Sequence, residues 1–271
     1  MTTSVPETQH PELVAVAHAL ADAAAAAAMP HFRADSLTAD NKAEAGRFDP
    51  VTAADRAAEA AMRAILAERR PDDAILGEEE APREATSGLT WVLDPSDGTR
   101  AFMSGLPVWA TLIGLNAGQG PFLGVISQPY IGERFVGGLG QSALLRPGAE
   151  PRPLRTRPCA ELSQATLFST FPEIGTDAER AAFTNVSRQV RLTRYGTDCY
   201  AYGLLALGQI DLVIEAGLHA YDIQGPQAVI EAAGGRVTSW NGGPAHKGGR
   251  IVAAGDPRLH DAALEILSRA E

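Results

Sequence analysis

The segment from Trp91 to Thr99 constrains what this chain can fold into more than any other stretch. A short apolar run leads directly into two carboxylates, Asp94 and Asp97. Pro95 stiffens the turn between them, so both carboxylates can converge on one point, and Gly98 lets the backbone come close to a ligand. Hard divalent cations bind such oxygen ligands. The segment predicts a strand that ends in a metal-binding turn, although the pattern alone also fits an ordinary Asp-rich turn.

Three further segments carry acidic residues that can join the same site. Glu78 and Glu79 follow a predicted strand, and Asp222 lies just ahead of a predicted helix. Asp55 opens another helix together with Thr52, with the spacing of a capping box in which Asp replaces Glu. Taken singly, each segment also fits a structural role, as a solvated acidic turn or a helix cap.

In the N-terminal half, two helix signals are followed by four strand signals. An Ala-rich helix is expected over residues 11–29, with Pro11 in its first turn; interrupting acidic residues favour a soluble helix over a signal peptide. A loop with room for a short hairpin follows at residues 31–50, and a second helix runs from Thr52 to about Arg69. Strands are expected at Ala74–Gly77, Thr90–Leu93, Trp109–Asn116 and Phe122–Gln128.

A proline-rich stretch from Arg146 to Pro158 marks the predicted domain boundary, between an N-terminal α+β domain of residues 1–150 and a C-terminal α/β domain of residues 151–271. Strands beyond it are expected at Ala165–Ser169, Val190–Tyr195, Ile210–Glu215, Arg236–Ser239 and Ile251–Ala254. Helices are expected at Thr176–Ser187, Cys199–Leu207, near Gln224–Ala233 and from Pro257 onward. This alternation predicts layered helices and sheets of the α/β class.

Charge and cysteine content argue against several classes of protein. The net charge of −10 disfavours a nucleic-acid binder, which normally carries a basic surface. Cys159 and Cys199 form no Cys-x-x-Cys pair, so neither a zinc site nor a disulfide framework is expected, and a reducing cytoplasm is the predicted location. Outside residues 11–29 there is no apolar run of about 18 residues, so no membrane span is expected.

The acidic segments, in their order and spacing, resemble the motifs of the inositol monophosphatase-like phosphatases. These motifs are Asp55, Glu78-Glu79, Asp94-Pro95-Ser96-Asp97-Gly98-Thr99 and Tyr221-Asp222. The resemblance extends from about Lys42 to Gly235 and implies the layered α-β-α-β-α sandwich of that superfamily. The chain departs from the family pattern around Asp222, where the family usually has Trp-Asp-x-x-Ala-Gly and this chain has Tyr221-Asp222-Ile223-Gln224-Gly225-Pro226. The aspartate itself is kept.

Within this superfamily the chain resembles the histidinol-phosphatase branch. The segments that carry this resemblance are Gly98–Phe102 with Gly105–Pro107, Arg194–Tyr202 and Gly208–Leu218. It implies a phosphate monoester hydrolase of histidine biosynthesis that acts on L-histidinol phosphate, and it suggests a homodimer. An inositol-1-phosphate phosphatase with the same metals stays open, as does a regulatory binding protein on the same fold.

The resemblance also implies roles for individual residues. Two or three Mg2+ ions, for which Mn2+ can substitute, would be held by Glu78, Asp94, Asp97, Asp222 and the carbonyl of Ser96. Thr99 would orient an attacking water and pass its proton toward Glu79 or Asp55, which makes these three the catalytic residues.

The substrate-binding residues are expected to be Gly98, Thr99, Arg194, Asp198 and Glu215. Histidinol phosphate carries an ammonium group and an imidazole, so its pocket needs carboxylates opposite the phosphate, and Asp198 and Glu215 are the candidates. Asp198 equally fits a helix N-cap ahead of Cys199. Arg194 fits a surface ion pair as well as a phosphate contact.

Overall fold

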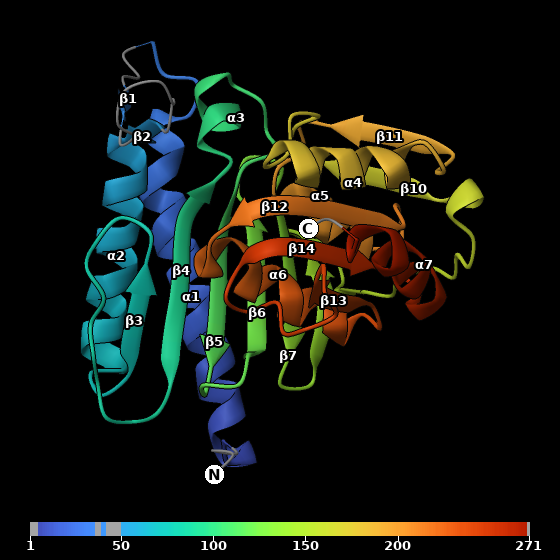
Figure 1. The fold of residues 1–271 in the computed structure, drawn as a ribbon. Coiled ribbons are helices and arrows are strands. Elements are labelled where there is room, and N and C mark those ends of the chain that lie inside the picture. Colours follow the sequence, from blue (N-terminus) through green and yellow to red (C-terminus); the bar gives the residue numbers. More distant parts are fainter. Residues whose placement is uncertain (1–4, 36–38, 42–49, 270–271) are drawn as a thin grey trace.

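The computed structural model describes residues 5–35, 39–41 and 50–269, which form five alternating layers of helices and sheets (Figure 1). The layers are α1 (His10–Ala28) with α2 (Ala53–Arg69), a seven-stranded sheet, α5 (Tyr200–Ala206) with α6 (Ala220–Ala232), a five-stranded sheet, and α4 (Asp177–Ser187) with α7 (Pro257–Leu267). The predicted α/β class and α-β-α-β-α layering are therefore confirmed.

The two N-terminal helices begin as the sequence predicts. Pro11 lies in the first turn of α1, and Thr52 caps α2 in a capping box with Asp55. Short 3-10 turns at Glu7–Gln9 and Met29–His31 extend α1, and by length and composition alone this stretch could cross a membrane. Its inward side chains instead pack in the core with α2 and the larger sheet: Leu13, Val16, Ala17, Leu20, Ala21 and Ala24. The apolar composition is that of a core helix.

A short strand pair lies between these helices, in the region predicted as a loop with a hairpin. β1 (Ala39–Asn41) pairs antiparallel with β2 (Pro50–Thr52). Residues 36–38 and 42–49 of this predicted loop lie outside the described residues.

The seven-stranded sheet has the strand order of the sequence. Its strands are β3 (Ala74–Gly77), β4 (Thr90–Asp97), β5 (Ala110–Asn116), β6 (Pro121–Gln128), β7 (Glu133–Gly138), β8 (Gln141–Leu145) and β9 (Arg152–Pro153). β3 and β4 are parallel, and the other neighbours are antiparallel. β4 runs on through the acidic turn, beyond its predicted end at Leu93. The strands β7 to β9 were not predicted; Leu139 and Gly140, both with positive φ, join β7 to β8 without the usual Asn-Gly signal.

The five-stranded sheet has the order β11-β10-β12-β14-β13. Its strands are β10 (Thr166–Ser169), β11 (Leu192–Tyr195), β12 (Leu212–Leu218), β13 (Arg236–Ser239) and β14 (Gly249–Ala254), and α3 (Thr99–Met103) and a 3-10 turn at Leu162–Gln164 complete the chain. All five predicted strands are present. β12 lies further along the chain than expected, because it continues past Glu215 through an irregular pairing with β14.

A row of three glycines lets α6 lie unusually close to the larger sheet. Gly114, Gly124 and Gly137 face one another across β5, β6 and β7. A Cβ at Gly124 would lie 2.1 Å from the Gly225 carbonyl oxygen, and one at Gly137 would lie 2.5 Å from the Val229 Cα. No larger residue fits without moving the helix. The row therefore sets where α6, and the residues of its first turn, meet the sheet.

Side chains from both sides of the predicted domain boundary share one hydrophobic core. This core joins Leu112, Ile126 and Phe135 of the larger sheet with Val213 and Ile251 of the smaller one, through α5 and α6 between them. In addition, β9, which lies beyond residue 150, still pairs with β8. The division into two domains stays a prediction.

Candidate active site

Two parallel strands bring the first acidic segments together. Gly77 at the end of β3 is the register partner of Leu93 in β4, and the Glu78 N–H donates to the Leu93 carbonyl at 3.2 Å. Parallel strands have their carboxyl ends at the same edge of a sheet. Glu78 therefore leaves β3 beside Asp94 of β4.

A bulge in β4 presents Asp94 and Asp97 to the same region. The pairing with β5 shifts register between these two residues, and a bulge of this kind re-aims side chains. Inside it, the Ser96 N–H donates to Asp94 Oδ1 at 3.0 Å, and the Thr111 hydroxyl donates to the Pro95 carbonyl at 2.9 Å. Local hydrogen bonds thus hold the acidic turn in place.

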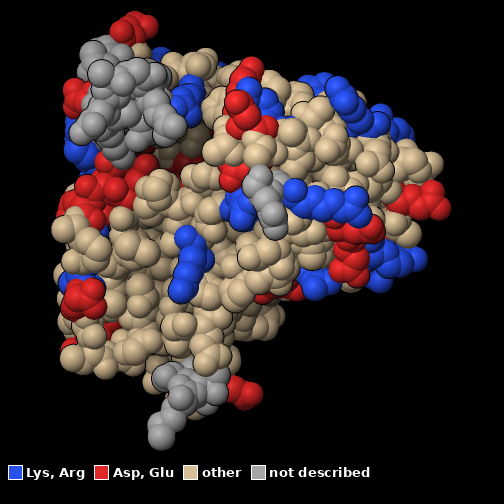
Figure 2. All heavy atoms as spheres, in the orientation of Figure 1, with Lys and Arg blue, Asp and Glu red and all other residues tan. Residues whose placement is uncertain are grey.

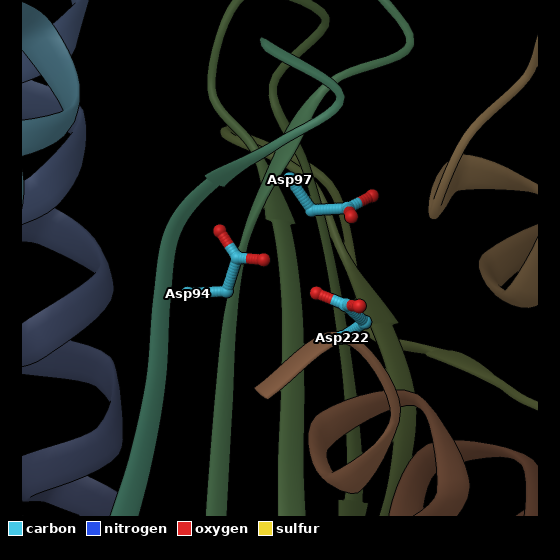
Figure 3. A group of neighbouring side chains, drawn as sticks. All are labelled: Asp94, Asp97 and Asp222. Atoms are coloured by element: carbon cyan, nitrogen blue, oxygen red, sulfur yellow. The ribbon is translucent and has the colours of Figure 1, made fainter. Parts of the chain in front are cut away.

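Asp222 completes the acidic cluster from the helix α6. Asp222 lies in the first turn of α6, with His219 as N-cap, rather than ahead of the helix as predicted. Its Oδ2 accepts the His219 N–H at 2.6 Å, which places the helix start two residues earlier than the aspartate. Oxygen atoms of Asp94, Asp97 and Asp222 all lie within 4.8 Å of one another (Figure 3).

The cluster concentrates negative charge in a buried place. Burial raises the pKa of Asp94 well above its ordinary value, and the Glu78, Asp97 and Asp222 carboxylates raise it further. Burial, followed by Asp222 and Asp198, raises the pKa of Asp97, and burial raises the pKa of Asp222 to about 6. Such carboxylates call for a positive counter-charge, and their hard oxygens suit divalent cations. The residues present fit a metal centre.

A cavity of about 480 Å³ opens over this cluster. Most of the predicted site residues line it: Glu78, Asp94, Asp97, Gly98, Thr99, Asp198, Glu215 and Asp222. On the face shown in Figure 2, acidic side chains also gather on the left, where α2 and β3 lie in Figure 1. The structure thus brings together residues that are up to 144 positions apart, from Glu78 to Asp222.

Four predicted site residues, all within the described part of the chain, are not among those that line the cavity. The Asp55 carboxylate is buried and accepts the N–H and hydroxyl of Thr52, at 2.6 and 2.7 Å. The Ser96 carbonyl accepts the Thr99 hydroxyl at 3.3 Å, and Arg194 is exposed on the edge strand β11. Glu79, the fourth, follows Glu78 but does not line the cavity. Their roles in the chemistry stay predictions.

Glu59, which the sequence analysis did not single out, holds the acidic loop after β3. It is fully buried and accepts the N–H groups of Glu79 and Glu80 at 2.7 and 3.1 Å, while Arg63 pairs with it at 2.8 Å. A Cβ at Gly77 would lie 2.0 Å from Glu59 Oε1, so this position needs glycine. From the sequence, Glu59 and Arg63 are an ordinary surface pair on a helix, and only their burial reveals the role.

One wall of the cavity carries Asp198 and Glu215. Glu215 Oε1 accepts the N–H and hydroxyl of Thr170 at 2.6 and 2.9 Å, yet burial raises the pKa of Glu215 to about 8. Burial also raises the pKa of Asp198 to about 6, against the opposing charge of Arg100. The N-cap of α5 is Cys199, without a side-chain cap bond, so the alternative of Asp198 as an N-cap is wrong.

Arg100 and Phe171 also line the cavity and were not predicted as site residues. The Arg100 guanidinium carbon lies 5.4 Å from the centre of the Phe171 ring. Arg100 directly follows Thr99 at the end of the acidic motif, so its position in the sequence could have identified it as a site residue. Phe171 lies in a segment without a motif, and only the packing of β10 beside β12 brings it to the site.

Known proteins have the same fold and are similar to this chain in sequence. An inositol monophosphatase from Zymomonas mobilis superimposes with a TM-score of 0.83 at 41% identity, over 96% of this chain and 98% of that one. A bifunctional phosphatase, IMPL2, from Arabidopsis thaliana is 40% identical over 96% of this chain and 76% of its own length. A histidinol-phosphatase from Mycobacterium tuberculosis is 37% identical, over 96% and 98%.

The layered fold and the partly buried carboxylate cluster define a metal-dependent phosphatase. More particularly, the chain belongs to the inositol monophosphatase family, whose model matches residues 9–271. The family resemblance seen in the four acidic motifs is thereby confirmed, and so is the branch resemblance, since histidinol-phosphatases are among the relatives.

Proposed function

We propose that this phosphatase hydrolyses L-histidinol phosphate to L-histidinol and phosphate, with Mg2+ as its metal and Mn2+ able to replace it. The observation that carries the proposal is the presence of Asp198 and Glu215 in the same cavity as the acidic cluster. The substrate has a phosphate at one end and an ammonium group and an imidazole at the other. Its two ends therefore match a cation-holding cluster and a carboxylate-lined wall.

The metal ions would be held by Glu78, Asp94, Asp97, Asp222 and the Ser96 carbonyl. When bound there, divalent cations supply the positive charge that offsets the phosphate dianion and makes water more acidic. The buried carboxylates supply the matching negative charge, and the bulge in β4 holds two of them ready. Preorganised ligands of this kind need little rearrangement on binding.

Thr99 is the proposed positioning group for the attacking water. Its hydroxyl donates to the Ser96 carbonyl at 3.3 Å, and a hydroxyl that donates one hydrogen bond still has lone pairs to accept another. Thr99 would accept from the water and aim it at phosphorus, with the proton passing toward Glu79 or Asp55. Gly98 and Thr99 would contact the phosphate, and Arg194 is the remaining candidate for a charge contact.

Asp198 and Glu215 would receive the cationic end of the substrate. Charge-assisted hydrogen bonds are roughly twice as strong as neutral ones. A neutral polyol such as inositol cannot form them. The wall therefore favours histidinol phosphate over inositol phosphate, in keeping with the histidinol-phosphatase among the relatives.

Phosphate release in the presence of Mg2+ tests the proposal. We expect a higher kcat/KM for histidinol phosphate than for inositol 1-phosphate. The reverse order would favour an inositol-1-phosphate phosphatase, in keeping with the Zymomonas relative, which is named an inositol monophosphatase. No turnover of either ester would favour a regulatory binding protein on this fold. The homodimer and the cytoplasmic location implied by the resemblance are further proposals, which sedimentation and cell fractionation can test.

A further inference from the structure

The hydroxyl of Tyr202 is a buried polar group that the mechanism above does not use. Tyr202 lies on α5 with 3% of its surface exposed, and its ring belongs to the core between the two sheets. It also lines the active-site cavity. Within the described part of the chain, its hydroxyl has no hydrogen-bond partner. Buried hydroxyls in native proteins are nearly always bonded, so this one calls for a ligand.

The surroundings of this hydroxyl indicate what it can bind. Glu215 exerts the largest charge effect on Tyr202, followed by Asp97 and Asp222 of the acidic cluster, and together with burial they raise the pKa of the phenol well above its ordinary value. The hydroxyl therefore stays protonated and can donate one hydrogen bond and accept others. Tyr202 lines the same cavity as the acidic cluster and the carboxylate wall, and its hydroxyl is buried at the edge of that site.

Glu215 alone offers too little to a cationic group. One of its oxygens already accepts two hydrogen bonds from Thr170, and the other lies 3.5 Å from the Ser169 hydroxyl. A substrate ammonium has three N–H donors to satisfy. A phenylalanine at position 202 would fill the same space without an unpaired hydroxyl, so the tyrosine adds a second acceptor to the cavity that Glu215 also lines.

We propose that Tyr202 is a specificity-determining residue whose hydroxyl, together with Glu215, binds the part of the substrate beyond the phosphate. The hydroxyl accepts an N–H of the substrate's cationic end and donates its own hydrogen to a carboxylate oxygen. This inference rests on the proposed function for the identity of that end, histidinol. The observations that support the contact are the unpaired hydroxyl and the place of Tyr202 in the cavity wall.

The experiment compares Tyr202→Phe with a matched control, Tyr200→Phe. Tyr200 lies on the same helix, does not line the cavity, and donates its hydroxyl to Glu133 at 2.5 Å. For each protein, kcat and KM are measured with histidinol phosphate and with methyl phosphate, which ends before the proposed contact, and the melting temperature is recorded without substrate.

Tyr202→Phe should lower kcat/KM for histidinol phosphate about tenfold relative to methyl phosphate, as expected for a lost hydrogen bond to a charged group. Its melting temperature should stay the same or rise, because an unpaired buried hydroxyl is removed. Tyr200→Phe should lower the melting temperature and leave the ratio of the two substrates unchanged.

Equal losses on both substrates, or no loss on either, would overturn the role of Tyr202. The wild-type measurements separate this result from a failure of the proposed function. If the wild type prefers inositol 1-phosphate, histidinol phosphate is the wrong substrate. The effect of Tyr202→Phe is then measured as the change in kcat/KM for inositol 1-phosphate relative to that for methyl phosphate. A selective loss there would still support the contact, and its absence would overturn it.

Discussion

The backbone N–H of Cys199 donates a hydrogen bond to Oδ2 of Asp97 at 2.9 Å. The two residues are 102 positions apart and come from the end of β4 and the start of α5. One carboxylate oxygen of a proposed metal ligand is therefore held by a residue from beyond the proline-rich stretch. The acidic cluster acquires its geometry only when both parts of the chain are folded together.

Asp97→Asn should abolish turnover while preserving this link, because the amide oxygen of Asn can still accept the Cys199 N–H. Metal-assisted chemistry contributes several kcal/mol of barrier lowering, so we expect a loss of about a hundredfold or more in kcat. Asp94→Asn should behave alike. The melting temperatures of the two Asn variants should be unchanged or higher than that of the wild type, because a buried negative charge is removed. Asp97→Ala should lower the melting temperature, because it loses the hydrogen bond from the Cys199 N–H. Wild-type activity of either Asn variant at limiting Mg2+ would show that the ligand assignment is wrong.

Removal of metal ions should abolish phosphate release, and addition of Mg2+ or Mn2+ should restore it. The reason is that the cluster offers only hard carboxylate oxygens, without thiolate or imidazole ligands. Metal binding to the folded state alone should also raise its stability, by about 2.7 kcal/mol when the free ion is at a hundred times its Kd. Activity assays and thermal melts after dialysis against a chelator measure both effects. Full activity after exhaustive dialysis would rule out the proposed mechanism.

Gly98→Ala should reduce both stability and activity. Gly98 has φ of 87°, and a Cβ there would lie 3.1 Å from the Asp198 Cβ and 3.2 Å from the Trp109 Cα. A strained backbone conformation of this kind costs about 1–3 kcal/mol. The matched control is Gly118→Ala, where φ is 91° and no atom lies within 4 Å of the new Cβ. Unfolding in urea and kcat/KM should show a larger effect for Gly98→Ala. Equal effects would mean that crowding against Asp198 is unimportant.

Asp198→Ala should weaken the use of histidinol phosphate much more than that of a neutral phosphate monoester. A charge-assisted hydrogen bond contributes roughly 1.5–3 kcal/mol, which corresponds to about tenfold or more in relative kcat/KM. Asp198 does not cap α5, but its φ of 42° is tolerated better by Asp than by Ala, so a moderate fall in the melting temperature is expected beside the change in substrate preference. Asp177→Ala, at a 98% exposed side chain on α4, controls for the change in net charge. Equal losses of kcat/KM on both substrates would show that Asp198 does not recognise the cationic end of histidinol phosphate.

The metal-free protein should lose stability as the pH rises, in part because of Glu215. Burial raises its folded-state pKa from the ordinary 4.5 to about 8. The folded protein therefore keeps a proton that the unfolded chain releases, and this stabilising contribution, present at low pH, is lost between about pH 4.5 and 8. Each pKa unit corresponds to about 1.4 kcal/mol. Urea unfolding in a chelating buffer at three pH values should show a steeper fall for wild type than for Glu215→Gln. Parallel curves would contradict the raised pKa.

Local patterns in the sequence were enough to predict the helices, most strands and the acidic turn after Leu93. Thr52 and Asp55 form the predicted capping box because its spacing is a property of one helical turn. Pro95 and Gly98 shape the acidic turn through their own backbone preferences. Where such signals were weak, prediction failed, as at the Leu139-Gly140 turn between β7 and β8.

Motifs in the sequence were enough to identify the acidic residues, whereas which of them come together depends on the tertiary fold. The parallel pairing of β3 with β4 brings Glu78 to Asp94, and the glycine row under α6 brings Asp222 to the same place. Arg194 was predicted from the sequence as a substrate-binding residue, and in the structure it is exposed on the edge strand β11. No sequence pattern pointed to Tyr202, which stands out only because its buried hydroxyl has no partner among the described residues. Periodicity and turn chemistry act over a few residues, whereas strand register and helix–sheet distance depend on side-chain volumes that meet only after folding.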